Sequence, residues 1–186
     1  MLVRKAGFGL GLGTPELEFR LASITLLVGV IHGALCPMSP RISPADRYSQ
    51  RLRDGFLRKF GRYGIGFVCP KNEDWFSCCG RRYFYKHATA RPTLTRSWQW
   101  TGLKKLKEFT NDHPTAMVVL EAKGRFGVRG KTFLVEAKKL LATIKGKNSF
   151  SIPMTSDSGR PISKLLRSPD CVKVHADLVR EFRRAS

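Results

Sequence analysis

The stretch Lys123–Lys131, KGRFGVRGK, combines residue types that suit phosphate binding. It holds three glycines and four cations, and it contains no acid. An apolar run, Ala116–Leu120, precedes it, and a helical pattern from Phe133 to Ile144 follows it. A flexible cationic loop between a buried strand and a helix start offers backbone N–H groups and positive charge to phosphate. The stretch therefore predicts a phosphate contact, with either a nucleotide or a nucleic-acid backbone.

The spacing of the glycines argues against a nucleotide. A P-loop places four residues between its first glycine and its Gly-Lys pair, and the corresponding position here is occupied by Arg125. The apolar runs after the loop also lack a terminal acid to hold magnesium. We expect no nucleotide hydrolysis and interpret the loop as inserting Arg125, Arg129 and Lys131 against an RNA backbone. A solvated hairpin or turn is the alternative interpretation.

Cys69, Cys78, Cys79 and His87 are the one group of candidate metal ligands. Their spacings differ from the short pairs of structural zinc sites, so buried thiols are the preferred interpretation and zinc is the alternative. The five cysteines follow no disulfide framework, which indicates reduced thiols. None of the four histidines lies in a catalytic motif. We expect a protein that is not an enzyme, with no cofactor and no small-molecule substrate.

A helix after Ser43 would present several of the cations. Ser43 is typical of an N-cap and Pro44 of the first helical position, and Gly61 closes the pattern. An apolar stripe of residues four apart predicts one buried face. The stripe consists of Tyr48, Leu52, Phe56 and Phe60. The arginines on the other faces are interpreted as facing RNA, and a solvated cationic face is the alternative.

The apolar pattern predicts the remaining elements. The predicted strands are 62–69, 81–87, 115–122 and a short one within 147–158. The predicted helices are 102–112, 133–144, one or two turns at 162–167 and a last one after Ser168. The turn 71–80 and the irregular segment 90–100 connect them. Strand 115–122 is apolar on both faces, as in a covered central strand.

Two aromatic segments lie beside cations. Arg81–His87 interleaves three aromatics with cations, a composition that stacks on unpaired bases, although inward-packed aromatics of a half-buried strand are the preferred interpretation. Trp98 and Trp100 point the same way in an extended chain. They are expected to hold their segment against the core or a neighbouring protein.

The charge balance predicts a polyanionic partner. Lys and Arg number 34 against 14 Asp and Glu, which gives a net charge of +20. Such a charge repels itself in a compact state unless a polyanion neutralises it. Residues 1–40 contribute little, with Arg4, Lys5 and Arg20 against Glu16 and Glu18. Nucleic acid is the first expected partner, and an anionic membrane is the second.

The N-terminal forty residues differ from the rest in character. Residues 21–36 carry no formal charge, and extension to Met38 reaches the lower limit of roughly 17–25 residues for a bilayer span. A targeting segment, a membrane anchor and a helix buried in an assembly all fit this pattern. We therefore predict an N-terminal extension, 1–40, followed by a basic domain, 41–186.

Together these features predict an α+β fold: a small mixed sheet with three to four amphipathic helices and an apolar N-terminal extension. Dispersed cations, basic loops, exposed tryptophans and terminal extensions are typical of a protein that threads along folded RNA. We expect a structural RNA-binding component of a large ribonucleoprotein, specifically a mitochondrial ribosomal protein that contacts rRNA and neighbouring proteins. The predicted RNA-binding residues are Arg51, Arg58, Lys59, Arg81, Arg82, Lys123, Arg125, Arg129 and Lys131. The alternative is an accessory subunit of a mitochondrial inner-membrane respiratory complex, anchored by Leu21–Met38; either protein would lie in the matrix or at the inner-membrane face.

Overall fold

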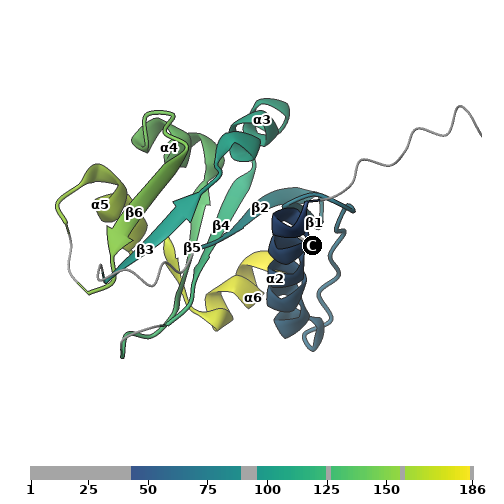
Figure 1. Cartoon of the computed structure of the whole chain (residues 1–186). Coiled ribbons are helices and arrows are strands. Elements are labelled where there is room, and N and C mark those ends of the chain that lie inside the picture. Colours follow the sequence, from purple (N-terminus) through teal and green to yellow (C-terminus); the bar gives the residue numbers. More distant parts are fainter. Residues whose placement is uncertain (1–42, 89–95, 125–126, 156–157, 185–186) are drawn as a thin grey trace, which may run out of the picture. The chain divides into compact units, whose positions relative to one another are not determined.

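The predicted α+β fold class is confirmed (Figure 1). The structure is a computed structural model that describes residues 43–88, 96–124, 127–155 and 158–184, all within the unit Ile42–Ser186. Five helices occur in these residues: α2 (Pro44–Gly61), α3 (Lys104–Asp112), α4 (Ala137–Thr143), α5 (Pro161–Arg167) and α6 (His175–Arg184). The strands are β1 (Trp75–Cys78), β2 (Arg81–His87), β3 (Ser97–Thr101), β4 (Met117–Ala122), β5 (Lys131–Glu136), β6 (Ser149–Pro153) and β7 (Val172–Lys173).

The main sheet has the strand order β1-β2-β4-β5-β7. β2 and β4 run parallel and the other neighbours are antiparallel, so the sheet is mixed as predicted. A separate antiparallel pair, β3-β6, forms a second sheet. β4 lies at the centre of the main sheet, which agrees with its continuous apolar sequence.

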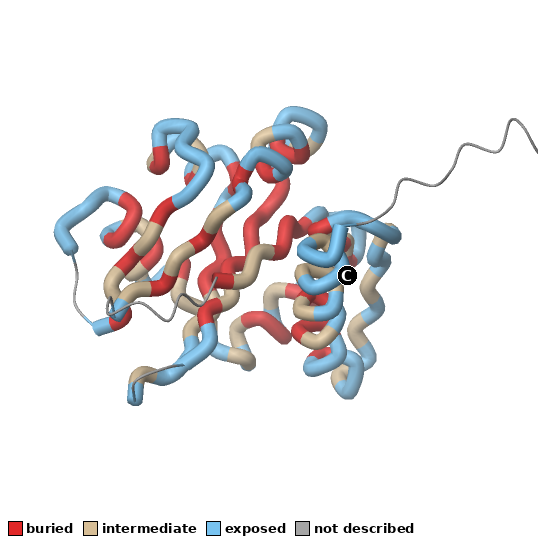
Figure 2. Tube along the Cα trace, in the orientation of Figure 1, coloured by how far each residue is buried: buried red, intermediate tan, exposed pale blue. Residues whose placement is uncertain are grey.

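Alternate residues of the main sheet contribute to two different cores. Val118 and Leu120 face a core shared with β3, β6, α3, α4 and α5, whereas Met117 and Val119 face a core shared with α2 and α6. Figure 2 shows the resulting pattern, with buried strands between helices whose outer faces are exposed. The domain is therefore three-layered, and the α2–α6 layer covers one face of the sheet.

The segment before α4 corrects one prediction. Residues 133–136 belong to strand β5 rather than to a helix, and the helix begins only at Ala137. Phe133 and Val135 are buried in one core and Leu134 in the other. A strand covered on both faces has no apolar alternation, so its sequence matches a helical pattern equally well. The cationic stretch consequently joins two antiparallel strands, which makes it a hairpin loop rather than a strand-to-helix loop.

Other local predictions are wrong for related reasons. The predicted strand 62–69 contains only an isolated bridge, between Val68 and Ser77, and the predicted turn 71–80 contains β1. The irregular segment 90–100 ends in β3, while 89–95 lie outside the described residues. The last helix begins at His175, because Val172 pairs with Phe133 in β7. β3 and β7 pair with strands distant in sequence, whereas β1 forms a hairpin with β2 across the turn at Cys79 and Gly80.

The helix after Ser43 forms as predicted. The Ser43 hydroxyl accepts a hydrogen bond from the Asp46 backbone, and Pro44 occupies the first turn. Phe56 and Phe60 are buried on the predicted stripe, whereas Tyr48 is exposed. Arg53, one of the arginines interpreted as facing RNA or, in the alternative, solvent, is instead 4% exposed.

The predictions about the N-terminal extension fall outside the described residues. Leu21–Met38 and the proposed boundary at residue 40 both belong to this part of the chain. Among the residues from 43 onward that are described, no helix has the length and apolar character needed to cross a membrane.

Candidate nucleic-acid interface

Three of the predicted cations meet where the β4–β5 hairpin joins the sheet. Lys123 and Lys131 flank the hairpin loop, and Lys59 comes from the last turns of α2; all three line one hollow of about 290 Å³. The strand register places Lys131 opposite Ala122, so the hairpin base contributes one lysine from each of its two strand ends. We call this feature the hairpin hollow. Tertiary packing thus joins a helix cation to the glycine-rich loop.

Glu121 is the one acid in the wall of the hairpin hollow. Its Oε1 lies 2.9 Å from Lys59 Nζ, and its Oε2 accepts a hydrogen bond from the Tyr85 hydroxyl. Burial and the neighbouring Glu121 carboxylate raise the pKa of Tyr85, so the phenol remains a neutral donor. Both carboxylate oxygens are therefore occupied.

His87 lies next to Glu121 in the parallel β2–β4 register. Its Nε2 is buried and has no hydrogen-bond partner among the described residues. Burial lowers the pKa of His87; Glu121 opposes this effect, and Lys123 and Lys59 add to it. The folded protein therefore favours a neutral imidazole at this position.

This lowered pKa predicts a pH-dependent stability. The unfolded chain binds a proton at His87 near pH 6.5, whereas the folded chain binds it only at lower pH, so stability should fall as the pH drops below 6.5. We expect His87→Gln to reduce the loss of unfolding free energy between pH 7.5 and 5.5, measured by urea denaturation. Equal losses in the variant and the wild type would contradict this assignment.

Arg81 and Arg82 lie at the opposite end of β2 from His87, about 20 Å away at roughly 3.3 Å per residue. Arg81 Nη1 is 2.7 Å from Glu181 Oε1. The Arg82 guanidinium contacts His113 and lies 5.8 Å from the centre of the Trp75 ring. These two arginines therefore do not share a site with the hairpin lysines.

The remaining predicted cations lie on other surfaces. Arg51 and Arg58 are exposed on α2, and Arg129 is exposed beyond the hairpin tip. Arg125 lies outside the described residues. The nine predicted residues thus form several patches rather than one, spread over α2 and both ends of the sheet.

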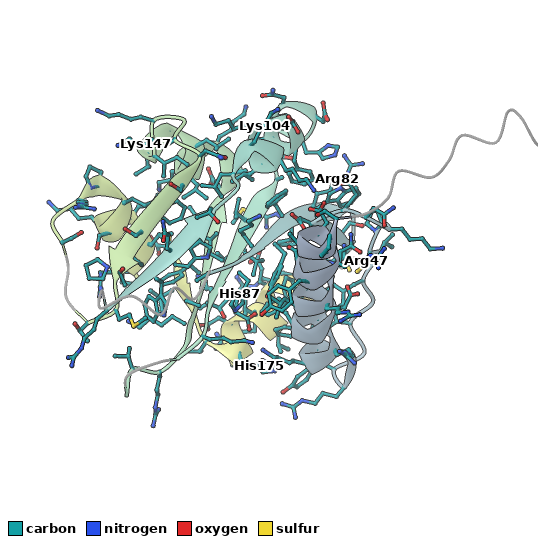
Figure 3. The ribbon with its side chains drawn as sticks, in the orientation of Figure 1. Arg47, Arg82, His87, Lys104, Lys147 and His175 are labelled. Carbon is teal, nitrogen blue, oxygen red and sulfur yellow. The ribbon has the colours of Figure 1, made fainter. Side chains whose placement is uncertain are left out.

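A further cationic surface lies over α3 and α4, which contact each other. Figure 3 shows Lys104 and Lys147 at this end of the molecule. We call this surface the lysine end; its exposed or half-buried members are Lys104, Lys107, Lys138, Lys139, Lys145 and Lys147. The helical spacing of Leu106 and Phe109 leaves the lysines of residues 104–107 on an outer face, but only tertiary packing brings the two helices together.

The aromatic residues of the described segments expose less surface for stacking on RNA bases than the RNA-binding interpretation predicts. Tyr83, Phe84 and Tyr85 are buried, which agrees with the preferred inward-packed interpretation. Trp98 and Trp100 are also buried, so they hold β3 to the core and the expectation of exposed tryptophans is wrong for these two. A different tyrosine, Tyr48, is exposed on α2.

The cysteines do not assemble a metal site in the described part of the chain, where no three His, Cys, Asp or Glu side chains are grouped suitably. Cys78 is buried in β1 and Cys79 is exposed in the following turn, with their sulfur atoms 3.8 Å apart. Burial and the neighbouring Cys79 raise the pKa of Cys78 to about 12, so its thiol stays protonated at neutral pH. His87 lies at the far end of β2 from this turn.

Comparisons with protein-family models, curated proteins and solved structures find no match for this chain. The functional argument therefore depends on the geometry and charge of the domain.

Proposed function

We propose that this protein binds RNA as a structural component of a large ribonucleoprotein, and that the mitochondrial ribosome is this assembly. The observation that carries the proposal is the excess of positive charge that the fold leaves unneutralised. Ion pairs among the described residues engage seven cations: Arg53, Lys59, Arg81, Lys86, Lys104, Lys105 and Arg180. The described residues contain 28 of the chain's 34 Lys and Arg, since six lie outside them, so a polyanion is needed to offset the mutual repulsion of the excess charge.

The distribution of these cations supports RNA over a membrane surface. Exposed cations occur on the α2 face, at the lysine end and around the hairpin, which lie on different sides of the domain (Figure 3). A planar anionic membrane contacts one side of a small domain. Folded RNA, in contrast, surrounds a protein and presents phosphates to several sides. Arginine on α2 and α6 also suits phosphate, because the guanidinium donates two parallel hydrogen bonds.

The hairpin provides the first test of RNA binding. We expect replacement of Arg125, Arg129 and Lys131 by alanine to weaken binding to single-stranded RNA and to reduce the slope of log affinity against log salt by about 2, since each lost phosphate contact removes about 0.7. Fluorescence anisotropy at several NaCl concentrations measures this slope.

The matched control keeps the charge at the same positions. Arg125→Lys, Arg129→Lys and Lys131→Arg together should retain a slope close to that of the wild type, because the number of neutralised phosphates is unchanged. An alanine variant that binds RNA with the wild-type affinity and slope would contradict a role for the hairpin.

The assembly is tested in salt-washed, detergent-solubilised mitochondria separated on a density gradient. We expect the protein to sediment with ribosomal RNA and to leave those fractions after ribonuclease treatment. Sedimentation with a membrane complex that persists after ribonuclease would instead support the respiratory-subunit alternative.

A further inference from the structure

The hairpin hollow differs from two other hollows of the described structure in how its charged groups are occupied. The hollow beside Arg81 and Arg82 also contains Asp112 and Glu181, and Arg81 is paired with Glu181. The groove beside α2 has three cations, Arg53, Arg58 and Lys71, against Asp54, and its buried Arg53 guanidinium is occupied by backbone carbonyls. The hairpin hollow has three lysines against one carboxylate, and both oxygens of that carboxylate are already occupied.

Three separate elements build the hairpin hollow. α2 contributes Lys59 and the Phe56 and Phe60 rings, the hairpin contributes both its strand ends, and α6 contributes His175 and Leu178. Its volume of about 290 Å³ lies just below the roughly 300–1,000 Å³ typical of small-ligand sites. The space therefore suits a compact group rather than a large ligand.

Only one of the three lysines in this hollow is paired with a carboxylate of the described residues. Lys59 is paired with Glu121, whose second oxygen is occupied by Tyr85. Lys123 and Lys131 have no carboxylate within 4 Å among the described residues. Two lysines at one concave place, with their only acidic neighbour already neutralised, form a site for a compact anion.

We propose that the hairpin hollow binds one phosphate group, held by Lys123 and Lys131, and that this group is a backbone phosphate of the RNA. The choice of RNA as the source rests on the proposed function. Lysine binds phosphate as a point charge and requires no glycine-rich cradle. Phosphate recognition is thus assigned to the side chains at the hairpin base rather than to the backbone amides of the loop.

His175 supplies a local reporter for this site. It lies in the wall of the hollow, stacked on Phe60 with ring centroids 4.7 Å apart. Burial lowers the pKa of His175, and Arg62 and Lys59 add to this effect. An anion beside the ring changes its electrostatic surroundings, so the imidazole NMR signals respond to binding. His175→Gln identifies these signals by their loss.

The experiment titrates the full chain with inorganic phosphate against sodium chloride of matched ionic strength, and separately with a short single-stranded RNA. We expect both phosphate and RNA to shift the His175 signals in the wild type. Lys123→Gln with Lys131→Gln should abolish these shifts. Lys138→Gln with Lys139→Gln, which removes the same charge from the lysine end, should leave the phosphate-induced shift unchanged.

The two proposals fail in different ways. If RNA binds but neither RNA nor phosphate shifts the His175 signals, the proposed phosphate site is wrong. The proposed function, RNA binding, is then still supported. A phosphate shift that is the same in the Lys123/Lys131 variant likewise overturns the site. A phosphate shift in a protein that binds no RNA supports the phosphate site, assigns it to a free phosphate ligand and overturns the proposed function.

Discussion

Replacement of Arg53 by methionine should lower the free energy of unfolding by about 3 kcal/mol or more, since hydrogen bonds to a charged group contribute about 1.5–3 kcal/mol each. Its Nη1 donates to the carbonyl oxygens of Pro70, Glu73 and Trp75, and its Nε and Nη2 contact Asp54. Methionine preserves the apolar stem but leaves these carbonyls without their donor. Urea denaturation followed by circular dichroism measures the loss.

The control for Arg53 is an exposed arginine of the same helix. Arg47→Met removes the same charge and should change stability by less than about 0.5 kcal/mol, as is usual for surface substitutions. Arg53 lies at 4% exposure and connects α2 to the irregular segment before β1. Equal effects of Arg53→Met and Arg47→Met would mean that the buried guanidinium is not essential to this segment.

Gly130→Ala should also be strongly destabilising, by about 1–3 kcal/mol, the usual range for overpacking. A Cβ atom at Gly130 would lie 2.8 Å from the Ala122 carbonyl oxygen and 3.0 Å from the Gly124 backbone nitrogen. Neither backbone atom can rotate away as a side chain would. The two strands of the hairpin base must separate, and thermal unfolding should record a lower Tm.

Alanine substitutions at two other glycines are controls that distinguish the steric clash at Gly130 from the general effects of replacing a glycine. Gly66→Ala has open space at its Cβ position and should be close to neutral. Gly127 has φ +76° with open space, so alanine there should cost about 1–2 kcal/mol through left-handed backbone strain alone. A Gly130→Ala protein as stable as Gly66→Ala would show that the hairpin base accommodates a side chain.

The glycines of the cationic stretch have a different structural role from the one that their number indicates. Their number suggested a flexible loop that offers backbone N–H groups to phosphate. Gly124 and Gly130 instead allow two backbones to approach closely at the hairpin base. Glycines in a sequence indicate that the backbone there either approaches another segment closely or has unusual dihedral angles. Which backbone segment comes close is known only from the β4–β5 register.

The predicted elements differ in how far local sequence determined them. α2 could be predicted from Ser43 and Pro44, because capping acts between residues within one helical turn. β4 could be predicted because a short apolar run bounded by turn residues is typical of a covered strand. β1, β5 and β7 were missed for different reasons. β7 is two residues long and is stabilised by pairing with β5, about forty residues earlier. β1 is a short strand of a local hairpin, and β5 is apolar on both faces, so its sequence also matches a helical pattern.

The candidate interface divides in the same way. Composition alone determined that this chain has a large positive charge, since residue counts do not depend on folding. Tertiary structure decided which cations remain available: it buried Arg53, paired Arg81 with Glu181 and paired Lys59 with Glu121. These contacts join residues as many as 100 positions apart, and sequence spacing carries no information about such distances. The amount of charge is therefore a property of the sequence, whereas its concentration at the hairpin hollow is a property of the fold.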